Sequence, residues 1–200
     1  MGFKDYAEKQ SLLKDKYGIK ILIDRGLPYP TLDFQDLPIV RLPEPRIQQE
    51  SIEFLGYRFS SNNDGKMRTS RLFRAAVTHI TAHTVTEEPR LLGAQSLSAQ
   101  FVETLVRDVY AFTKIEAEQP DRFADLAYAN ALATASFKPL KRIYLPSNRI
   151  MTAILAHIFG GKPLDELEKS EVELVGDIAE RLRELKSEIS SSLGEGEIDD

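Results

Sequence analysis

The sequence predicts a mostly α-helical protein: a multi-helix bundle with an extended, proline-rich N-terminal strap and a long acidic C-terminal helix. Three observations support this prediction. Apolar residues recur with the 3.6-residue period of an amphipathic helix in several long segments after residue 68. Five prolines fall within residues 28–45, a stretch that a helix cannot cross. Acidic residues greatly outnumber basic ones in the last part of the chain.

Before the first long helix, short apolar stretches alternate with turn residues. The alternation at residues 19–23 predicts a short strand, and we expect no other. Residues 27–45 are too apolar for a free linker, so they predict a strap lying over the domain, with a partner-binding segment as the alternative. We expect a helix at residues 46–54 and a polar turn at residues 60–65.

The later helices have sequence signals at their ends. Thr69 or Ser70 can cap the first of them, and Ser96 can begin the second. Pro120 ends the second helix, and the pair Gly160-Gly161 is typical of a helix C-terminus. The expected helices span residues 69–86, 96–118, 123–137 and 150–159.

The C-terminal part of the chain is acidic. Residues 165–200 contain 13 acidic and 4 basic residues and carry −9, which leaves +4 on residues 1–164 of the total of −5. We therefore expect a helical domain (1–164), an acidic helix (165–193) and a disordered acidic tail (194–200). The helix is either solvated or packed through an apolar seam, which would need a partner helix within the chain or in a homo-oligomer. The seam consists of Val175, Ile178, Leu182, Leu185 and Ile189.

Composition excludes several classes of protein. The 200 residues are 42% apolar and 28% charged, which excludes wholesale disorder, and the absence of cysteine excludes disulfide scaffolds and thiolate metal sites. No stretch is long and apolar enough to span a membrane, and the N-terminus has no apolar export signal, so we expect a cytoplasmic protein. Neither part of the chain is basic enough to bind nucleic acid. The sequence contains no P-loop, dinucleotide fingerprint or nucleophile elbow, so we predict no catalytic or cofactor-binding residues from such motifs.

Two of the three histidines lie four residues apart. His79 and His83 would share one face of their helix, where both imidazoles could bind one divalent ion such as zinc or iron. Ile80 stands where the helical zinc peptidases have a glutamate, which argues against a peptidase. The alternatives are a hydrogen-bonded histidine pair at the edge of the core and a role in acid–base chemistry.

Asp108 interrupts an otherwise apolar helical stripe. A buried carboxylate must be paired or bound to a cation, so we expect Asp108 to be buried and ionised beside one. The cation is either Arg71 or Arg74, or a metal ion held by His79 and His83, to which Asp108 would be the third ligand. Alternatively, Asp108 orients one of these histidines. The stripe consists of Phe101, Leu105, Asp108, Phe112 and Ile115.

Further basic residues lie near the ends of helices. His157 falls in the last turn of its helix, where the helix dipole favours a cationic imidazole. Four basic residues surround Tyr144 and predict a site for an anion or an acidic partner, with the acidic arm of the same chain as the alternative. They are Lys138, Lys141, Arg142 and Arg149.

Residues 68–118, together with the following Gln119-Pro120-Asp121, resemble a known family. A His-x-x-x-His helix followed by a helix with an acidic position is similar to the helical N-terminal region of von Willebrand A-containing accessory proteins. These are the accessory proteins of cobaltochelatase, nitric oxide reductase activation and Rubisco activation. The resemblance implies a role beside AAA+ ATPases that insert or remodel metal cofactors. Of the acidic pair, arginine and further acid usual in that family, only Asp108 is present, and no von Willebrand A domain occurs in these 200 residues.

These observations leave two classes of function. The first, which we favour, is a non-catalytic accessory or adaptor protein or subunit that binds a partner protein, for instance in metal-cofactor insertion or enzyme activation. The apolar prolyl segment, the helical seam and the acidic arm each favour it, because a partner could complete each surface. The second is a metal-dependent enzyme or enzyme subunit that uses His79, His83 and Asp108.

Overall fold

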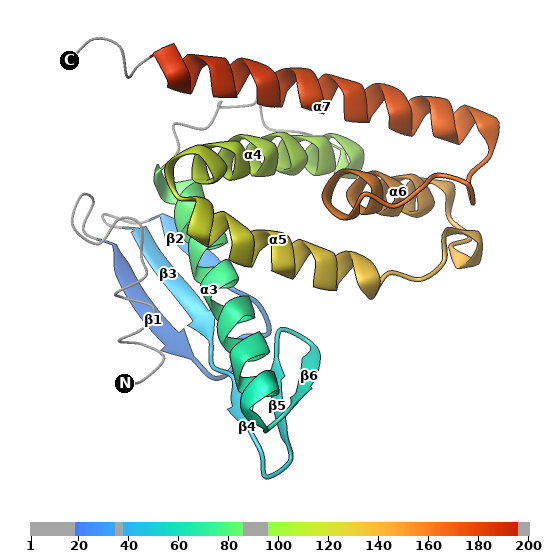
Figure 1. Cartoon of the computed structure of the whole chain (residues 1–200). Helices are drawn as coiled ribbons and strands as arrows, with labels where there is room; N and C mark the ends of the chain where they lie inside the picture. The colour runs from blue at the N-terminus through green and yellow to red at the C-terminus, as the bar shows by residue number, and fades with distance from the viewer. Residues whose placement is uncertain (1–18, 35–37, 86–95, 196–200) are drawn as a thin grey trace. The chain divides into compact units, whose positions relative to one another are not determined.

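The computed structural model describes residues 19–34, 38–85 and 96–195, and the chain divides into two compact units (Figure 1). The first unit comprises residues 1–86 and 121–128, and the second comprises residues 87–120 and 129–200. Helices account for most of the described residues, which confirms a mostly α-helical protein. The first unit nevertheless contains two small sheets.

The first sheet consists of β1 (Lys20–Asp24), β2 (Thr31–Phe34) and β3 (Pro38–Pro43) in the order β1-β3-β2. β3 runs parallel to β1, with Ile21 opposite Val40, and antiparallel to β2. The strand predicted at residues 19–23 is confirmed, but the expectation of no other strand is wrong. Much of the predicted strap is part of this sheet. The prolines of β3 stand at its two ends, where a missing N–H group is tolerated.

The second sheet is antiparallel and consists of β4 (Arg46–Ile47), β5 (Ser51–Phe54) and β6 (Tyr57–Ser60) in sequence order. The helix predicted at residues 46–54 is therefore wrong. Ile52 and Phe54 are both 3% exposed while Glu53 between them is half-buried, so the apolar pattern has the period of a strand.

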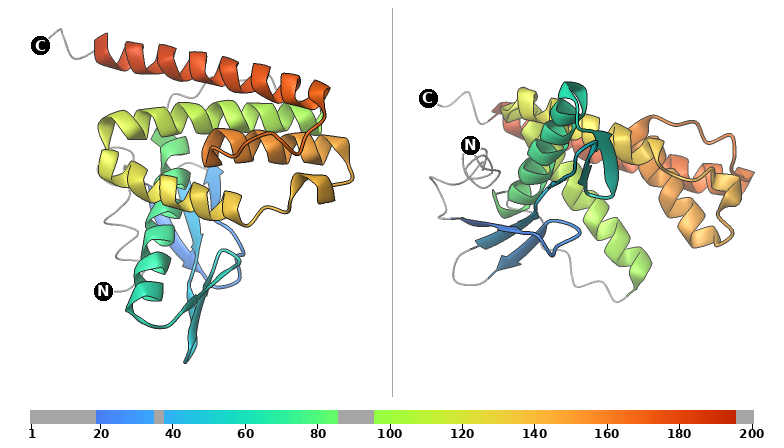
Figure 2. Two further views of the ribbon diagram at one scale, coloured as in Figure 1. Left: turned by 45° about the vertical axis from the view of Figure 1, so that its right-hand side comes forward. Right: turned by 90° about the horizontal axis from the view of Figure 1, so that it is seen from below.

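The helix α3 (Asn63–Val85) packs against β3, β5 and β6, and lies across both sheets (Figures 1 and 2). It begins earlier than predicted because the Asn62 side chain accepts a hydrogen bond from the Gly65 N–H at 2.9 Å, which caps the helix. A Cβ atom on Gly65 would lie 1.7 Å from the Ser60 carbonyl oxygen, so only glycine allows this approach of the helix to β6. Phe73 on the buried face of α3 contacts Phe54, with ring centroids 5.6 Å apart.

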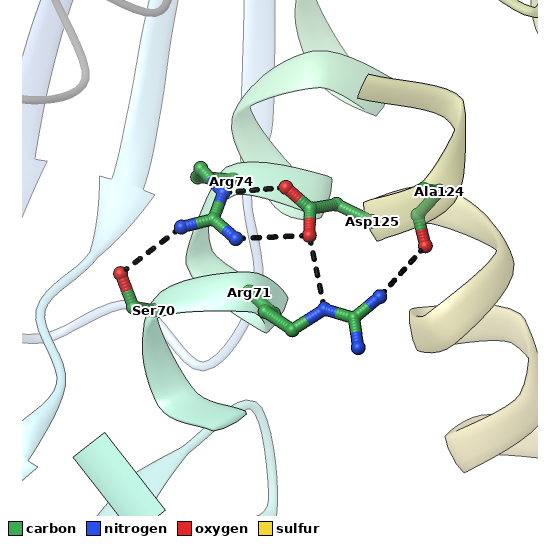
Figure 3. A network of polar contacts seen from close by, with 5 residues as sticks. All are labelled: Ser70, Arg71, Arg74, Ala124 and Asp125. Atoms are coloured by element: carbon green, nitrogen blue, oxygen red, sulfur yellow. Dashed lines mark hydrogen bonds and ion pairs between the residues drawn. The ribbon is translucent and has the colours of Figure 1, made fainter. Parts of the chain in front are cut away.

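A buried carboxylate joins the start of α5 (Pro120–Ala135) to α3 within the first unit (Figure 3). The Asp125 side chain is 11% exposed and accepts hydrogen bonds from the Arg71 Nε at 3.1 Å and the Arg74 Nη2 at 3.0 Å, besides one from the Arg74 Nε. Arg71 also donates to the Ala124 carbonyl at 3.1 Å and lies 4.4 Å from the centre of the Tyr128 ring. The two arginines considered as partners of Asp108 are thus both bound to a different carboxylate.

The second unit contains α4 (Leu97–Glu118), the short 3₁₀ helix η1 (Leu140–Arg142), α6 (Pro146–Gly160) and α7 (Lys169–Glu195), together with the end of α5. α7 packs against α4 and α6, so the apolar seam of the acidic arm has its partners within the chain. Val175, Leu182 and Ile189 of the seam are all buried. α7 extends to Glu195, and residues 196–200 of the predicted tail lie outside the described residues.

Most helix ends follow local sequence signals. The Ser96 side chain caps α4 by accepting from the Ala99 N–H at 3.2 Å, and Gly161 ends α6 with a positive φ of 60°, both as predicted. α5 and α6 begin earlier than predicted because Pro120 and Pro146 occupy the first helical turn, where a proline needs no N–H partner.

We expect the Asp125→Ala substitution to lower the free energy of unfolding by about 2–3 kcal/mol, because two partly buried guanidinium groups lose their charged acceptor. Urea denaturation followed by circular dichroism measures this loss. Asp121→Ala is the matched control, since Asp121 is an exposed carboxylate in the first turn of the same helix and should change stability by less than about 1 kcal/mol. Equal losses in the two variants would contradict the structural role of Asp125.

Candidate functional site

The predicted metal ligands lie on two helices. His79 and His83 are half-buried with ring centroids 4.9 Å apart, so the two imidazoles share one face of α3, as predicted. Asp108 lies on α4 of the second unit and is half-buried, not fully buried as expected. Two imidazole nitrogens and a carboxylate oxygen are ligands that zinc and iron(II) accept. The donor types therefore fit a divalent ion.

Arg149 and Lys141, two of the four predicted anion-binding residues, are occupied by the acidic C-terminal segment. The Arg149 Nε donates to the Glu171 Oε1 at 3.0 Å, and the two side chains are 20% and 10% exposed. The Lys141 Nζ lies 3.7 Å from the Glu166 Oε1, and Glu166 also accepts a hydrogen bond from the Leu140 N–H at 2.7 Å. For these two bases, the acidic arm of the same chain is a partner, as the alternative prediction held.

Glu171 also determines where α7 begins. Its second carboxylate oxygen accepts a hydrogen bond from the Glu168 N–H at 3.1 Å, three residues earlier in the chain. This is the return bond of a capping box, in which a side chain in the first turn binds the N–H of the capping residue. The same carboxylate therefore starts the acidic helix and holds Arg149 of α6.

The other two predicted bases, Lys138 and Arg142, lie on an exposed surface with two apolar side chains. Tyr144 is 90% exposed and Leu145 is 62% exposed, and both lie between η1 and α6. We call residues 138–145 the basic–apolar loop. The sequence indicated the bases of this loop but not the exposure of Leu145, because leucine is among the residues most often buried.

His157 has a structural partner at the C-terminal end of α6. Its Nδ1 lies 2.9 Å from the Lys162 carbonyl oxygen, so Nδ1 carries a proton and donates it. The Lys162 side chain in turn donates to the Thr134 carbonyl oxygen at 2.5 Å. His157 therefore holds the chain that follows α6, and its predicted place in the last turn is confirmed.

Comparisons with protein-family models, curated proteins and solved structures found no match to this chain. The resemblance to von Willebrand A-containing accessory proteins stays a prediction. Among the described helices, none combines the length and the apolarity needed to cross a lipid bilayer.

The pKa of the Glu171 carboxyl lies below its ordinary value of 4.5, mainly because Arg149 donates a hydrogen bond to the carboxylate. A lowered pKa means that the carboxylate stabilises the fold above pH 4.5 and that this contribution is lost as the pH falls through the pKa of the folded state. We expect wild-type protein to melt at a higher temperature than Glu171→Gln at neutral pH, and this difference to shrink below pH 4.5.

Thermal unfolding followed by circular dichroism between about pH 3 and pH 7 measures this difference. Glu173→Gln is the control, since Glu173 is 66% exposed on the same helix and should give no pH-dependent difference. A difference for Glu171→Gln that is constant across the range would contradict the assignment.

Proposed function

We propose that this protein is a non-catalytic accessory or adaptor protein that binds an acidic partner protein through the basic–apolar loop. The observation that carries the proposal is the exposure of Tyr144 and Leu145, at 90% and 62%, beside exposed lysine and arginine side chains. Tyrosine and arginine are enriched among the residues that dominate binding energy at protein interfaces. Covering these two apolar side chains would remove them from water, which favours association.

Hydrogen bonds and burial at its base hold the loop in place. Leu140 is buried, its N–H donates to Glu166, and the Ile143 N–H donates to the Leu140 carbonyl oxygen at 3.0 Å. Pro146 then begins α6. A loop that is ordered before binding loses less conformational entropy on association, so it is a suitable recognition surface.

The charge of the loop indicates the chemistry of its partner. Lys138, Lys141 and Arg142 are exposed. The Glu166 carboxylate lies 3.7 Å from the Lys141 Nζ, and the Lys141 side chain is 71% exposed. Such a pair is weakened by water and exchanges readily. The loop therefore presents an excess of positive charge around an apolar centre, and this favours a partner segment with acidic residues beside an apolar or aromatic side chain.

Selection from a phage-displayed peptide library tests this surface with a defined probe. We expect the full chain to enrich peptides in which acidic residues flank an apolar or aromatic one. Synthetic versions of these peptides should bind Tyr144→Ala and Arg142→Glu at least about tenfold more weakly than wild type.

Leu174→Ala and Arg181→Glu are the matched controls, since they remove an exposed leucine and reverse an exposed arginine on α7. Both should bind the selected peptides as wild type does. Enrichment of peptides without acidic residues, or equal binding by all four variants, would overturn the proposal.

A second candidate function is metal binding by His79, His83 and Asp108, which would make the protein a metal-dependent enzyme or enzyme subunit. The 4.9 Å between the two imidazole centroids supports this candidate, because both rings lie close enough for one nitrogen of each to reach a common ion. The carboxylate would complete an open site of two histidines and one acid, a set typical of non-haem iron and catalytic zinc.

Elemental analysis of protein purified without a histidine tag and dialysed against zinc(II) or iron(II) tests the metal candidate. We expect about one equivalent of metal, lost in the His79→Ala/His83→Ala double variant and weakened at least about tenfold in Asp108→Asn. His157→Ala is the control and should retain the metal, because that ring is bound to a backbone carbonyl. Metal retained by the double variant would show that it binds elsewhere.

A further inference from the structure

The first unit contains a cavity that no motif of the sequence predicts. Its volume is about 360 Å³, within the range of small-molecule sites. It is lined by the segment after β1, by the turn between β3 and β4, and by the β5–β6 hairpin. All of these segments belong to the first unit.

The hairpin that borders this cavity has an unfavourable residue at its tip. Phe54 and Tyr57 pair across the hairpin, so Leu55 and Gly56 form a two-residue turn, with φ angles of 50° and 79°. Positive φ at both positions is typical of a type I′ turn, where asparagine followed by glycine is preferred. A leucine in this conformation costs free energy, and its half-buried side chain lines the cavity. The turn alone would favour asparagine at this position, so the leucine is explained by its place in the cavity wall.

The cavity has two tyrosines in its wall. Tyr29, which follows β1, is 64% exposed, and Tyr57, at the start of β6, is half-buried. An aromatic ring left in water beside a cavity can stack on a flat ligand ring, and its hydroxyl group can donate or accept a hydrogen bond. Tyr29 and Leu55 thus suit a ligand with a planar apolar part.

A row of charges crosses the second sheet on the face opposite Tyr57, because Arg58 follows Tyr57 and successive side chains of a strand point to opposite faces. Arg46 on β4 lies opposite Glu53 on β5, and Glu53 lies opposite Arg58 on β6, so the three residues project from one face of the sheet. The Arg58 Nε is 3.9 Å from the Glu53 Oε1, and Arg58 is 69% exposed. One carboxylate between two guanidinium groups leaves an excess of one positive charge.

The remaining carboxylate of the wall does not change this balance. Glu44 is bound to Arg25, which neutralises it. Guanidinium groups recognise carboxylate and phosphate oxygens in preference to other anions, because their N–H donors match the spacing of two such oxygens.

From the cavity, the strained Leu55, the exposed Tyr29 and the arginine row, we propose that this site binds a small planar aromatic anion. In the proposed complex, the ring lies against Tyr29 and Leu55, and a carboxylate or phosphate group is held by Arg46 and Arg58. This site is independent of the basic–apolar loop and of the histidine pair, because none of those residues lines the cavity.

Ligand-observed NMR and calorimetry on the full chain test the proposal with matched pairs of compounds. The anionic members are 1-naphthoate, indole-3-carboxylate and adenosine monophosphate, and the uncharged members are 1-naphthamide, indole-3-carboxamide and adenosine. We expect at least one anion to bind, and to bind at least about tenfold more tightly than its uncharged counterpart.

An Arg46→Gln/Arg58→Gln double variant should lose this preference, and Tyr29→Ala should weaken the binding of the anion. Arg68→Gln, which changes another exposed arginine of the first unit, and Tyr144→Ala, which removes an exposed tyrosine of the second, should bind as wild type does.

Leu55→Asn separates a binding role from a structural one. Asparagine suits the type I′ turn, so this variant should melt at a higher temperature than wild type and yet bind the anion at least about tenfold more weakly. Loss of binding through misfolding is thereby excluded. The proposal is overturned if no anion of the panel binds, if charged and uncharged members bind equally, or if binding survives in the arginine and Leu55 variants.

Discussion

The first unit depends on the ion pairs between Asp125 of α5 and two arginines of α3. Burying a carboxylate to 11% exposure without a partner would cost free energy of folding. Here Arg71 and Arg74, about one turn apart on α3, each donate a hydrogen bond to it from Nε. The pairing fixes the start of α5 against the helix on which both sheets pack. It also occupies Arg71 and Arg74 with a carboxylate of their own unit. Because α5 continues from residue 128 into the second unit, this one cluster holds a helix that both units share.

In the second unit, the pair of Arg149 and Glu171 has the corresponding role. The acidic C-terminal arm covers its apolar seam on α4 and α6 and uses its first acidic residues to bind bases of the same unit. This internal pairing limits what the basic residues of the unit can do. Arg149 is bound to Glu171, whereas Lys138 and Arg142 remain exposed beside Tyr144. The predicted basic cluster thus contains residues of two kinds: Arg149 stabilises the fold, and Lys138 and Arg142 remain on the surface.

The helices could be predicted from the sequence because their signals are local. Ser96 and Gly161 act within one helical turn, and the period of the apolar residues extends over several turns. The short strands could not, because a four-residue strand such as β5 is stabilised by partners elsewhere in the chain, and two apolar residues, Ile52 and Phe54, are too few to establish a period of two. For the same reason the sequence showed that Arg71 and Arg74 could bind an acid but not which one. Asp125 lies 51 residues from Arg74, and its neighbours carry no pattern that marks it.

The two candidate binding regions share a physical property: each contains residues that a sequence selected for stability alone would not keep. Asparagine would relieve the turn at Leu55, and polar residues at positions 144 and 145 would remove two apolar side chains from water. Each exception also lies beside guanidinium groups that the fold leaves exposed, Arg46 and Arg58 in one case and Arg142 in the other. An apolar group next to an exposed positive charge contributes little to folding, whereas it contributes much to the binding of a ligand that has both apolar surface and negative charge. The two regions differ in shape, a cavity in one unit and a projecting loop in the other, and so they suit a small molecule and a protein segment respectively.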